Sequence, residues 1–564
     1  MGSNHLPFLK SKNGSWRNNL IYKEYGSIKE EENMAKDVRI GYDVGGTFTD
    51  GVMMRGKEVL AKAKALTTED VTTGIINALD VLLKSKKADP SEICLVSLGT
   101  THTTNAIIER RNLNKVGIFR LGAPATTAIP PLTGWPEDLK EAIGGVGNIF
   151  IIKGGKEYDG RDIVPLDEEE IREACRKIKG KVDSIAVTGV FSPMIPDQED
   201  RAAEIIREEL GDIPITLSNH IASISILERE NSTILNAAVI TVMRKAIEAL
   251  KKATRDRGID APLYIVQNDG TVMAAEYAVN YPIFTVASGP AASVRGAVYL
   301  SGVDNGVIVD IGGTSSDVAY IVNGFPRESS ITVTIGGVKT NIRCPDLMSI
   351  ALGGGTIVKT KGKEVIGLGP ESVGHNLVRL GKSFGGPIIT THDIGVATGV
   401  IDSKLDIFDT DFAPHIDKVK AMDKELIDAA YNKIKNTIEV AVDQMKTAAG
   451  DTKAIFVGGG ATVTPKKNLD GISEVILPPH FEVCGAIGTT IAEIGAYAEG
   501  VADLEKEDRD EAIKRVIERV KDEAEKAGAI RDTVEILDIE EIPFAYMPGK
   551  REKIRIRVKG KIFE

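Results

Sequence analysis

The chain has 564 residues, enough for two or more cores of ordinary domain size. Its 70 lysine and arginine residues and 81 aspartate and glutamate residues give a formal net charge of −11, which argues against broad binding to nucleic acid or to an anionic membrane. No apolar run approaches the roughly 20 residues that a membrane helix needs. The four cysteines lack Cys-x-x-Cys spacing, which favours reduced thiols in a cytoplasmic protein over a zinc knuckle or a disulfide framework: Cys94, Cys175, Cys344 and Cys484.

Residues 1–33 differ from the rest of the chain, because they are polar, lack sustained periodicity and contain no apolar core of a signal peptide. The codons for Lys29–Glu31 can spell AAGGAGG, the kind of ribosome-binding sequence that precedes a bacterial start codon. Two interpretations stay open. Residues 1–36 are either a translated leader, with the natural start at Met34, or a genuine disordered tail.

One sequence motif occurs twice, as DVGGTFTD at Asp43–Asp50 and as DIGGTSSD at Asp310–Asp317. Each copy follows an apolar run and precedes another, which predicts a strand, a glycine turn and a second strand. The paired glycines let backbone N–H groups approach a phosphate with no Cβ in the way, and the hydroxyls supply further donors. One such turn is ordinary hairpin chemistry. Two copies imply a duplicated α/β domain with a nucleotide clamped between the halves.

The two copies of this motif and a third glycine-rich turn supply the expected nucleotide site. Asp43 and Asp310, each at a strand end, are the candidate catalytic residues that organise Mg²⁺. Residues 454–465 read as a buried strand that runs into a turn on which adenosine can lie, with Thr462 and Thr464 as expected caps. The expected contacts to ATP come from Gly45, Gly46, Thr47, Phe48, Thr49, Gly312, Gly313, Thr314, Ser315, Gly458, Gly459, Gly460 and Thr462.

Hydrophobic periodicity predicts alternating helices and strands along the chain. The expected helices cover residues 68–86, 168–179, 232–255, 423–449 and 506–527. The expected strands outside the glycine turns cover residues 93–98, 116–119, 184–188, 263–266 and 553–558. The last of these alternates apolar and charged residues, which predicts a half-exposed strand in a small terminal sheet or at an edge added to the body. Residues 121–165 are rich in Gly and Pro, which predicts an inserted surface region.

Five segments in this order resemble the hydantoinase/oxoprolinase family, specifically its ATP-using A (α) subunit, within the actin-like ATPase and sugar kinase superfamily. They are Asp43–Asp50, Gly99–Ala106, Leu227–Ala237, Ser288–Pro290 and Asp310–Asp317. The resemblance implies duplicated actin-like ATPase (ribonuclease H-like) domains with a central nucleotide cleft and a small C-terminal strand-rich tail. The expected boundaries are 1–36 for the leader, 37–290 and 291–500 for the two ATPase domains, and 501–564 for the tail.

The resemblance also implies a reaction. The family transfers the γ-phosphoryl group of ATP to the carbonyl oxygen of a cyclic amide or imide, with Mg²⁺, and a β subunit completes the hydrolysis. A homo- or hetero-oligomer is therefore expected, with residues 121–165 and an unpaired sheet edge at residues 553–558 as docking surfaces. Two alternatives stay open: a subunit of an ATP-dependent ketone carboxylase, and an ATPase activator or reactivase. The scattered cysteines lower the second, because such activators often hold an iron–sulfur cluster.

Three further segments bear on the chemistry. Thr101, His102 and Asn105 lie in a dense polar loop and are the candidate substrate or γ-phosphate contacts, although His102, where the family is usually apolar, is as well explained as a surface histidine. The charged cluster 228–230 suits either catalysis or a buried ion-pair network, with a slight preference for the network. Met348 stands where the family usually has His, and a thioether neither transfers a proton nor binds hard cations well. His375 and His392 are the candidates that could replace this imidazole.

Overall fold

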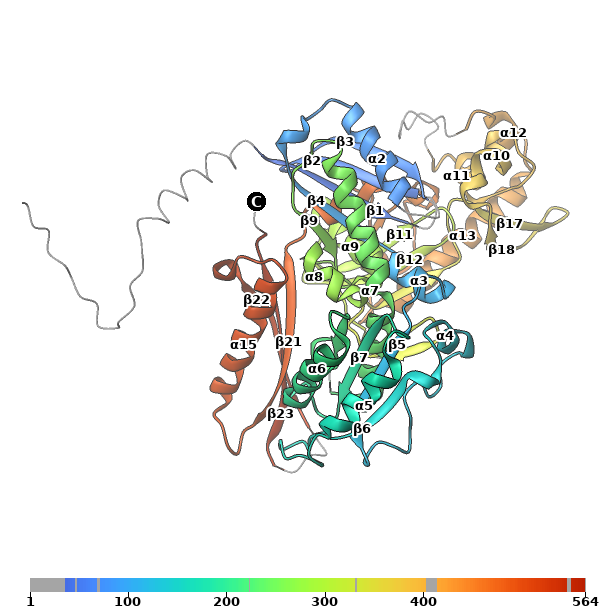
Figure 1. Cartoon of the computed structure of the whole chain (residues 1–564). Helices are drawn as coiled ribbons and strands as arrows, with labels where there is room; N and C mark the ends of the chain where they lie inside the picture. The colour runs from blue at the N-terminus through green and yellow to red at the C-terminus, as the bar shows by residue number, and fades with distance from the viewer. Residues whose placement is uncertain are drawn as a thin grey trace, which may run out of the picture.

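The computed structural model describes residues 36–45, 48–67, 72–222, 224–329, 332–401, 413–544 and 549–562. Gly46 and Thr47 of the first predicted phosphate turn, and the question of a leader before residue 36, lie outside the described residues. Within the described part of the chain no helix is long and apolar enough to cross a membrane. Three larger sheets form, joined through long helices (Figure 1).

The first sheet has nine strands in the order β22-β23-β21-β10-β9-β4-β1-β2-β3. Its strands are β1 Val38–Val44, β2 Phe48–Arg55, β3 Glu58–Leu66, β4 Ile93–Thr100, β9 Leu263–Val266, β10 Val272–Ala274, β21 Ile494–Asp503, β22 Glu535–Pro543 and β23 Arg551–Gly560. The helices associated with it are α2 Thr72–Lys84, α3 His102–Glu109, α7 Ile226–Arg255, α8 Ala275–Asn280, α14 Cys484–Thr490 and α15 Arg509–Lys526. The predicted helices 68–86, 232–255 and 506–527 correspond to α2, α7 and α15.

The second sheet has its main strands in the order β13-β12-β11-β19-β20, with β16 paired to β12. Its strands are β11 Gly306–Ile311, β12 Ser316–Val322, β13 Phe325–Pro326, β16 Leu347–Ile350, β19 Thr452–Val457 and β20 Ile472–Ile476. Two hairpins accompany it, β14 Val333–Ile335 with β15 Val338–Thr340 and β17 Thr356–Lys361 with β18 Glu364–Ser372. The helices of this half are α9 Ser288–Ser301, α10 Leu377–Leu380, α11 Thr391–Ala397, α12 Ile416–Lys420 and α13 Lys424–Met445.

The two sheets share one pattern, which confirms the predicted duplication. In the first half β1 pairs antiparallel with β2 and parallel with β4. In the second half β11 pairs antiparallel with β12 and parallel with β19. The central strands are apolar on both sides because helices cover both faces of each sheet, as is usual for parallel sheets. Both glycine turns therefore sit at the end of a buried central strand.

A third sheet, in the order β6-β5-β7-β8, forms a separate unit below the first half in Figure 1. Its elements are β5 Val116–Ala123, β6 Ile149–Lys153, β7 Ser184–Gly189 and β8 Ile215–Leu217, with the helices α4 Glu137–Ala142, α5 Glu168–Ile178 and α6 Asp197–Leu210. It has its own apolar core, centred on residues such as Phe119, Ile171 and Val187. Residues 121–165 thus contribute a strand and a helix to this unit and are not a surface loop alone.

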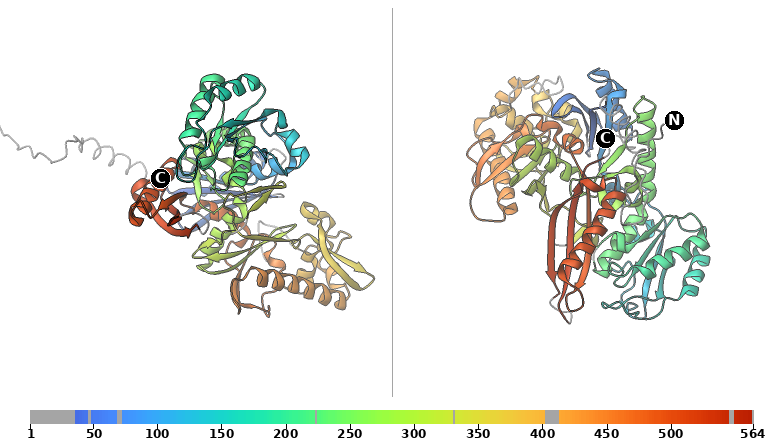
Figure 2. Two further views of the ribbon diagram at one scale, coloured as in Figure 1. Left: turned by 90° about the horizontal axis from the view of Figure 1, so that it is seen from below. Right: turned by 90° about the vertical axis from the view of Figure 1, so that its left-hand side faces the viewer.

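The C-terminal strands extend the first sheet, the second of the two arrangements left open by the sequence. Strand β21 pairs with β10, and β23 pairs with β21 on one side and with β22 on the other. Figure 2 shows these red strands standing side by side, backed by α15. The expected unpaired edge at residues 553–558 is therefore wrong, because β23 is an interior strand and Ile554, Ile556 and Val558 are buried.

Candidate functional site

The first glycine turn joins β1 to β2. Asp43 lies directly opposite Asp50 in the antiparallel register, and the N–H of Gly45 donates to the carbonyl of Phe48 over 3.0 Å, which closes the hairpin. Asp50 forms an ion pair with Lys64 of β3, and the Lys64 ammonium lies 5.1 Å from the centre of the Phe48 ring. Of the two acidic residues at these strand ends, Asp50 is paired with a cation, whereas Asp43 forms no ion pair with the described residues.

Thr49 supports this turn from the buried side. Its hydroxyl lies 3.2 Å from the hydroxyl of Thr67, which donates to the carbonyl of Gly45 over 2.8 Å. Thr49 is fully buried, so its predicted role as a nucleotide contact is limited to holding the backbone of the turn in place.

Glycines surround the carboxylate of Asp43. A Cβ built on Gly485 of α14 would overlap its Oδ2, while Cβ atoms on Gly99 and Gly289 would lie 3.3 Å and 3.5 Å from its Oδ1. Burial first, and then the like charges of Asp50 and Asp310, raise the pKa of Asp43 well above its usual range. The charge of Asp310 is one of these causes, so the strand-end aspartates of the two halves lie near each other.

The second glycine turn repeats this geometry with different neighbours. Asp310 lies opposite Asp317, and the N–H of Gly312 donates to the carbonyl of Ser315 over 2.9 Å. Burial raises the pKa of Asp310 to about 6, although a hydrogen bond from Ser293 of α9 acts in the opposite direction. Asp317 accepts a hydrogen bond from the hydroxyl of Ser349 at 2.5 Å.

The glycines of the second turn are open toward the cleft. Gly313, Thr314 and Ser315 are exposed, and a Cβ on Gly313 would meet nothing within 4 Å. Behind them lies a second run of glycines, Gly353–Gly355. The N–H groups of Gly354 and Gly355 donate to the carbonyls of Gly312 and Gly313 over 3.0 Å and 2.7 Å. This packing leaves the N–H groups on the cleft side of the turn available to a ligand.

Residues 353–355 are functional positions that the sequence reasoning did not assign. A Cβ on Gly353 would lie 2.7 Å from the backbone of Thr314 and 2.8 Å from the carbonyl of Gly312. The Gly-Gly-Gly run itself was the available signal, because glycine is required where one backbone approaches another closely.

The third turn, after β19, completes the cleft. Gly458 has a φ of +85°, and its added Cβ would overlap Oδ1 of Asp310. The N–H of Gly460 donates to the carbonyl of Ile311 over 2.7 Å, so this turn is bonded directly to the second phosphate turn. Gly459 is exposed, with nothing within 4 Å of an added Cβ.

The predicted capping role of the two threonines in this turn is wrong. Thr462 is buried inside a short 3-10 helix, Ala461–Val463, which has Gly460 at its N-cap and no side-chain cap. The hydroxyl of Thr464 instead donates to the carbonyl of Ala461 over 2.7 Å, which closes the turn from its far end.

The segment predicted as a polar loop is instead the first part of helix α3, and it lies beside the first glycine turn. Thr101 is the N-cap residue of α3, and its hydroxyl donates to the carbonyl of Val44 over 3.4 Å. The side chain of Asn105 donates to the Thr101 hydroxyl over 3.3 Å, and Nδ1 of His102 lies 3.0 Å from the hydroxyl of Thr100. The structure therefore brings Thr101, His102 and Asn105 together next to the turn that contains Gly45.

Two members of the charged cluster 228–230 of α7, Arg229 and Glu230, make buried contacts, whereas Glu228 is only partly buried and accepts a hydrogen bond from the hydroxyl of Ser225. Glu230 is 1% exposed and pairs with Arg120 of β5. Arg229 is fully buried and donates to the hydroxyl of Ser218 over 2.9 Å and to the carbonyl of Ile224 over 2.7 Å. These contacts support the preferred structural interpretation, in which the cluster joins α7 to the third sheet.

Met348 does not face a group of metal ligands. It lies on β16 opposite Val318 and packs against the core of the second half, while Asp346 pairs with Arg327. His392, a candidate replacement for the missing imidazole, is buried and stacks on Phe384 with ring centres 5.4 Å apart. Among the described residues no cluster of three or more His, Cys, Asp or Glu side chains could hold a metal by itself.

The cleft residues nevertheless fit a nucleotide with a divalent cation. Carboxylates such as Asp43 and Asp310 are the ligands that Mg²⁺ prefers, and burial is the main cause that raises both pKa values, an effect that a neighbouring cation opposes. Mg²⁺ is commonly held by one or two carboxylates together with substrate phosphates, so a purely protein cage is not required. The open glycine turns supply the backbone donors for those phosphates.

Comparisons with known proteins agree with this geometry. A model of the hydantoinase/oxoprolinase N-terminal region matches residues 39–210, and a hydantoinase/oxoprolinase model matches residues 229–497. The α subunit of caprolactamase from Pseudomonas jessenii is 28% identical over 82% of this chain and 67% of its own length. The γ subunit of acetophenone carboxylase from Aromatoleum aromaticum is 27% identical over 81% of this chain and 68% of its own length.

Solved structures show the same fold. The crystal structure of the ATP-dependent caprolactamase from Pseudomonas jessenii has a TM-score of 0.73 at 20% identity and covers 93% of this chain and 88% of that chain. The nucleotide-free structure of acetone carboxylase has a TM-score of 0.61 at 18% identity, with the same coverage. The two family models together match more than half of the sequence. The chain therefore belongs to the hydantoinase/oxoprolinase family, with the mixed α/β fold that caprolactamase and acetone carboxylase share.

Proposed function

We propose that this protein is the α subunit of an ATP-dependent ring-opening amidohydrolase, which phosphorylates the carbonyl oxygen of a cyclic amide or imide. The observation that carries the proposal is the pair of aspartates, Asp43 and Asp310, which end equivalent strands of the two halves, lie near enough that the charge of Asp310 raises the pKa of Asp43, and lie beside glycine turns. Phosphoryl transfer needs mainly positioning and charge neutralisation, which such a cleft supplies.

Each part of the cleft has a role in this proposal. The exposed residues Gly313–Ser315 present backbone and hydroxyl donors to the phosphates, Gly45 and Gly312 close the two turns, and the exposed Gly459 offers a flat surface to adenosine. Asp43 and Asp310 hold Mg²⁺, which when bound neutralises charge on the transferring phosphoryl group. Thr101 and its neighbours in α3 lie beside the first turn, where they orient the γ-phosphate or the substrate carbonyl.

A partner subunit completes the reaction in this proposal. No set of three or more potential metal ligands among the described residues is available to activate water. The caprolactamase and acetophenone carboxylase relatives are themselves named as subunits, which supports a hetero-oligomer. We place this assembly in the cytoplasm, and we assign the hydrolytic step to a β subunit.

A second candidate is the corresponding subunit of an ATP-dependent ketone carboxylase. It is favoured by the similarity to acetophenone carboxylase and by the fold shared with acetone carboxylase. Both reactions begin by activating a carbonyl oxygen with ATP, so the cleft geometry suits either one.

The experiment is an assay of the isolated chain and of the chain with its genomic neighbour. Each is incubated with Mg-ATP and with a lactam, a hydantoin or a ketone, with and without bicarbonate, while ADP and products are measured. We expect weak, uncoupled ATP turnover from the chain alone and ring opening only with the neighbour. Stoichiometric ring opening by the chain alone, with a contaminating partner excluded by mass spectrometry, would contradict the two-subunit arrangement. Bicarbonate-dependent ketone turnover would favour the carboxylase.

A further inference from the structure

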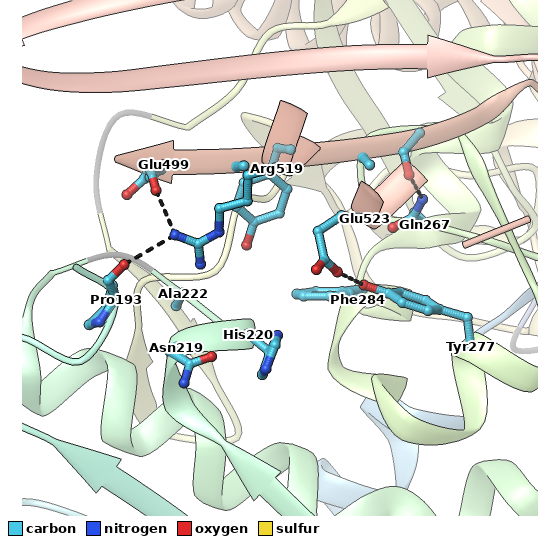
Figure 3. A pocket seen from close by; sticks show the side chains of 14 residues that line it. Pro193, Asn219, His220, Ala222, Gln267, Tyr277, Phe284, Glu499, Arg519 and Glu523 are labelled. Atoms are coloured by element: carbon cyan, nitrogen blue, oxygen red, sulfur yellow. Dashed lines mark hydrogen bonds between the residues drawn. The ribbon is translucent and has the colours of Figure 1, made fainter. Parts of the chain in front are cut away.

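A cavity lies away from the nucleotide cleft, where three parts of the molecule meet (Figure 3). The 3-10 helix Ser218–His220 of the third unit forms one wall, residues around Phe284 form the second, and β21 with α15 forms the third. Its empty space is about 630 Å³, including the open mouth. Such a junction between units is a common location for small-molecule sites.

Two side chains in this cavity, Asn219 and Arg519, have N–H donors that the described residues do not fully use. For Asn219 a hydrogen-bond acceptor is missing, and for Arg519 a carboxylate. Asn219 is only 7% exposed, and its Nδ2 has no hydrogen-bond partner among the described residues. The guanidinium of Arg519 uses one nitrogen, Nη1, to donate to the carbonyls of Pro193 and Glu499, both over 3.2 Å. No carboxylate of the described residues lies within ion-pair distance of Arg519.

Each of the two carboxylates that line the cavity has a cationic partner. Glu499 accepts a hydrogen bond from Nε of Arg555 at 2.7 Å. Glu523, one helical turn after Arg519 on α15, is bonded to Lys526 at 2.8 Å and to the hydroxyl of Tyr277 at 3.3 Å. The excess charge in the cavity is therefore that of Arg519, which favours an anion.

We propose that this cavity binds a small organic carboxylate, held by Arg519 and by the side-chain amide of Asn219. A guanidinium recognises a planar carboxylate through parallel N–H donors, and a buried amide donor gains a partner at the same time. The rings of Phe284 and Tyr277 line the same cavity and provide apolar surface for the carbon part of the ligand. Inorganic phosphate has no such part, so it gains no contact with the apolar surface of Phe284 and Tyr277.

The test is calorimetric titration of the full chain with acetate, propionate, acetamide and inorganic phosphate at constant ionic strength. We expect saturable binding of the two carboxylates and none of acetamide. Arg519→Gln and Asn219→Asp should each weaken carboxylate binding at least about tenfold. The matched control is Arg515→Gln, because Arg515 lies one turn earlier on α15, is exposed, and pairs with Glu507; it should bind as the wild type does.

Three results would overturn the proposal. They are equal heats for acetate and acetamide, unchanged carboxylate affinity in folded Arg519→Gln, and saturable binding of phosphate alone. Circular dichroism of each variant shows whether it is folded. If Arg519→Gln does not fold, Asn219→Asp decides the question, and carboxylate affinity equal to the wild type in that variant likewise contradicts the proposal. The measurement requires no nucleotide, so its outcome is independent of the proposed ATP reaction.

Discussion

The two glycine turns are copies in sequence and in backbone register, yet their surroundings differ. Asp43 is enclosed by glycines of α14, β4 and α9, and its charge is opposed by Asp50 and Asp310. Asp310 instead receives a hydrogen bond from Ser293, and its partner across the hairpin, Asp317, receives one from Ser349. The pKa of Asp43 is accordingly raised well above its usual range, whereas that of Asp310 is raised to about 6.

This difference teaches that a duplicated hairpin need not give two equivalent acids. Where glycines remove every donor side chain, a carboxylate depends on a cation for compensation. Where serines supply donors, the carboxylate is partly compensated by the protein itself. We infer that Asp43 depends more strongly on bound Mg²⁺ than Asp310 does.

The largest expected effect comes from removing each charge. Asp43→Asn and Asp310→Asn should each reduce Mg²⁺-dependent ATP turnover by at least about 100-fold, since each removes a carboxylate that we assign to the cation. The greater loss is expected for Asp43→Asn. The exposed Asp212→Asn variant serves as the control in the same steady-state ADP assay. Wild-type turnover in both cleft variants would show that the nucleotide site lies elsewhere.

The second expected effect is on the free energy of unfolding as a function of pH, measured without Mg²⁺. A carboxyl whose pKa is raised on folding contributes stability while it is protonated, and this contribution is lost as the pH rises from the unfolded value of 3.8 through the folded value of about 6. Asp310→Asn cannot ionise, so it should exceed the wild type by about 3 kcal/mol at about pH 8 and match it below about pH 3.

Urea unfolding followed by circular dichroism at several pH values measures this difference. For Asp43→Asn the gain over the wild type should continue to grow at pH values where that of Asp310→Asn has levelled off, because the pKa of Asp43 is raised further. Coinciding profiles for the two variants would contradict the distinction between the two turns.

The smallest expected effect comes from substituting glycines that have free space beside them, in contrast to glycines that pack against other backbone. Cβ atoms on Gly313 and Gly459 meet nothing in the protein, so Gly313→Ala and Gly459→Ala should keep the wild-type melting temperature. Each should weaken ATP binding roughly tenfold, because the methyl group occupies space that we assign to the nucleotide. Gly147→Ala, on a surface 3-10 helix with equally open space, is the matched control. Unchanged ATP affinity in both cleft variants would argue against the assigned binding face.

The sequence predicted the elements that depend on local patterns. Strands β1, β2, β11 and β12 end and begin at the two Gly-Gly motifs, because an apolar run followed by glycines specifies a strand and its turn without distant information. Helix α7 was predicted from residue 232 but begins at Ile226. Its first turns contain charged residues that are buried only because the third sheet packs on them, and periodicity treats such residues as exposed.

Partners distant in sequence could not be predicted in the same way. The alternation in residues 553–558 shows that one face of that strand is buried, but it does not show which strands lie on either side. The pairing of Lys64 with Asp50 and the packing of Gly353–Gly355 behind Gly312 likewise depend on tertiary contacts. In the candidate site, the sequence therefore indicates which residues end the strands but not the tertiary contacts that hold them; their role in binding stays a prediction.

The sheet that joins β1 to β21–β23 has a consequence for biosynthesis. The strands of the second half, residues 306–476, are contiguous in sequence and can pair as soon as they are made. The first half instead waits for residues 484–560, because α14 covers Asp43 and β21 completes the edge at β10. Contacts of such long sequence separation form slowly and leave an open sheet edge in the nascent chain. The surroundings of Asp43 are therefore among the last parts of this protein to assemble.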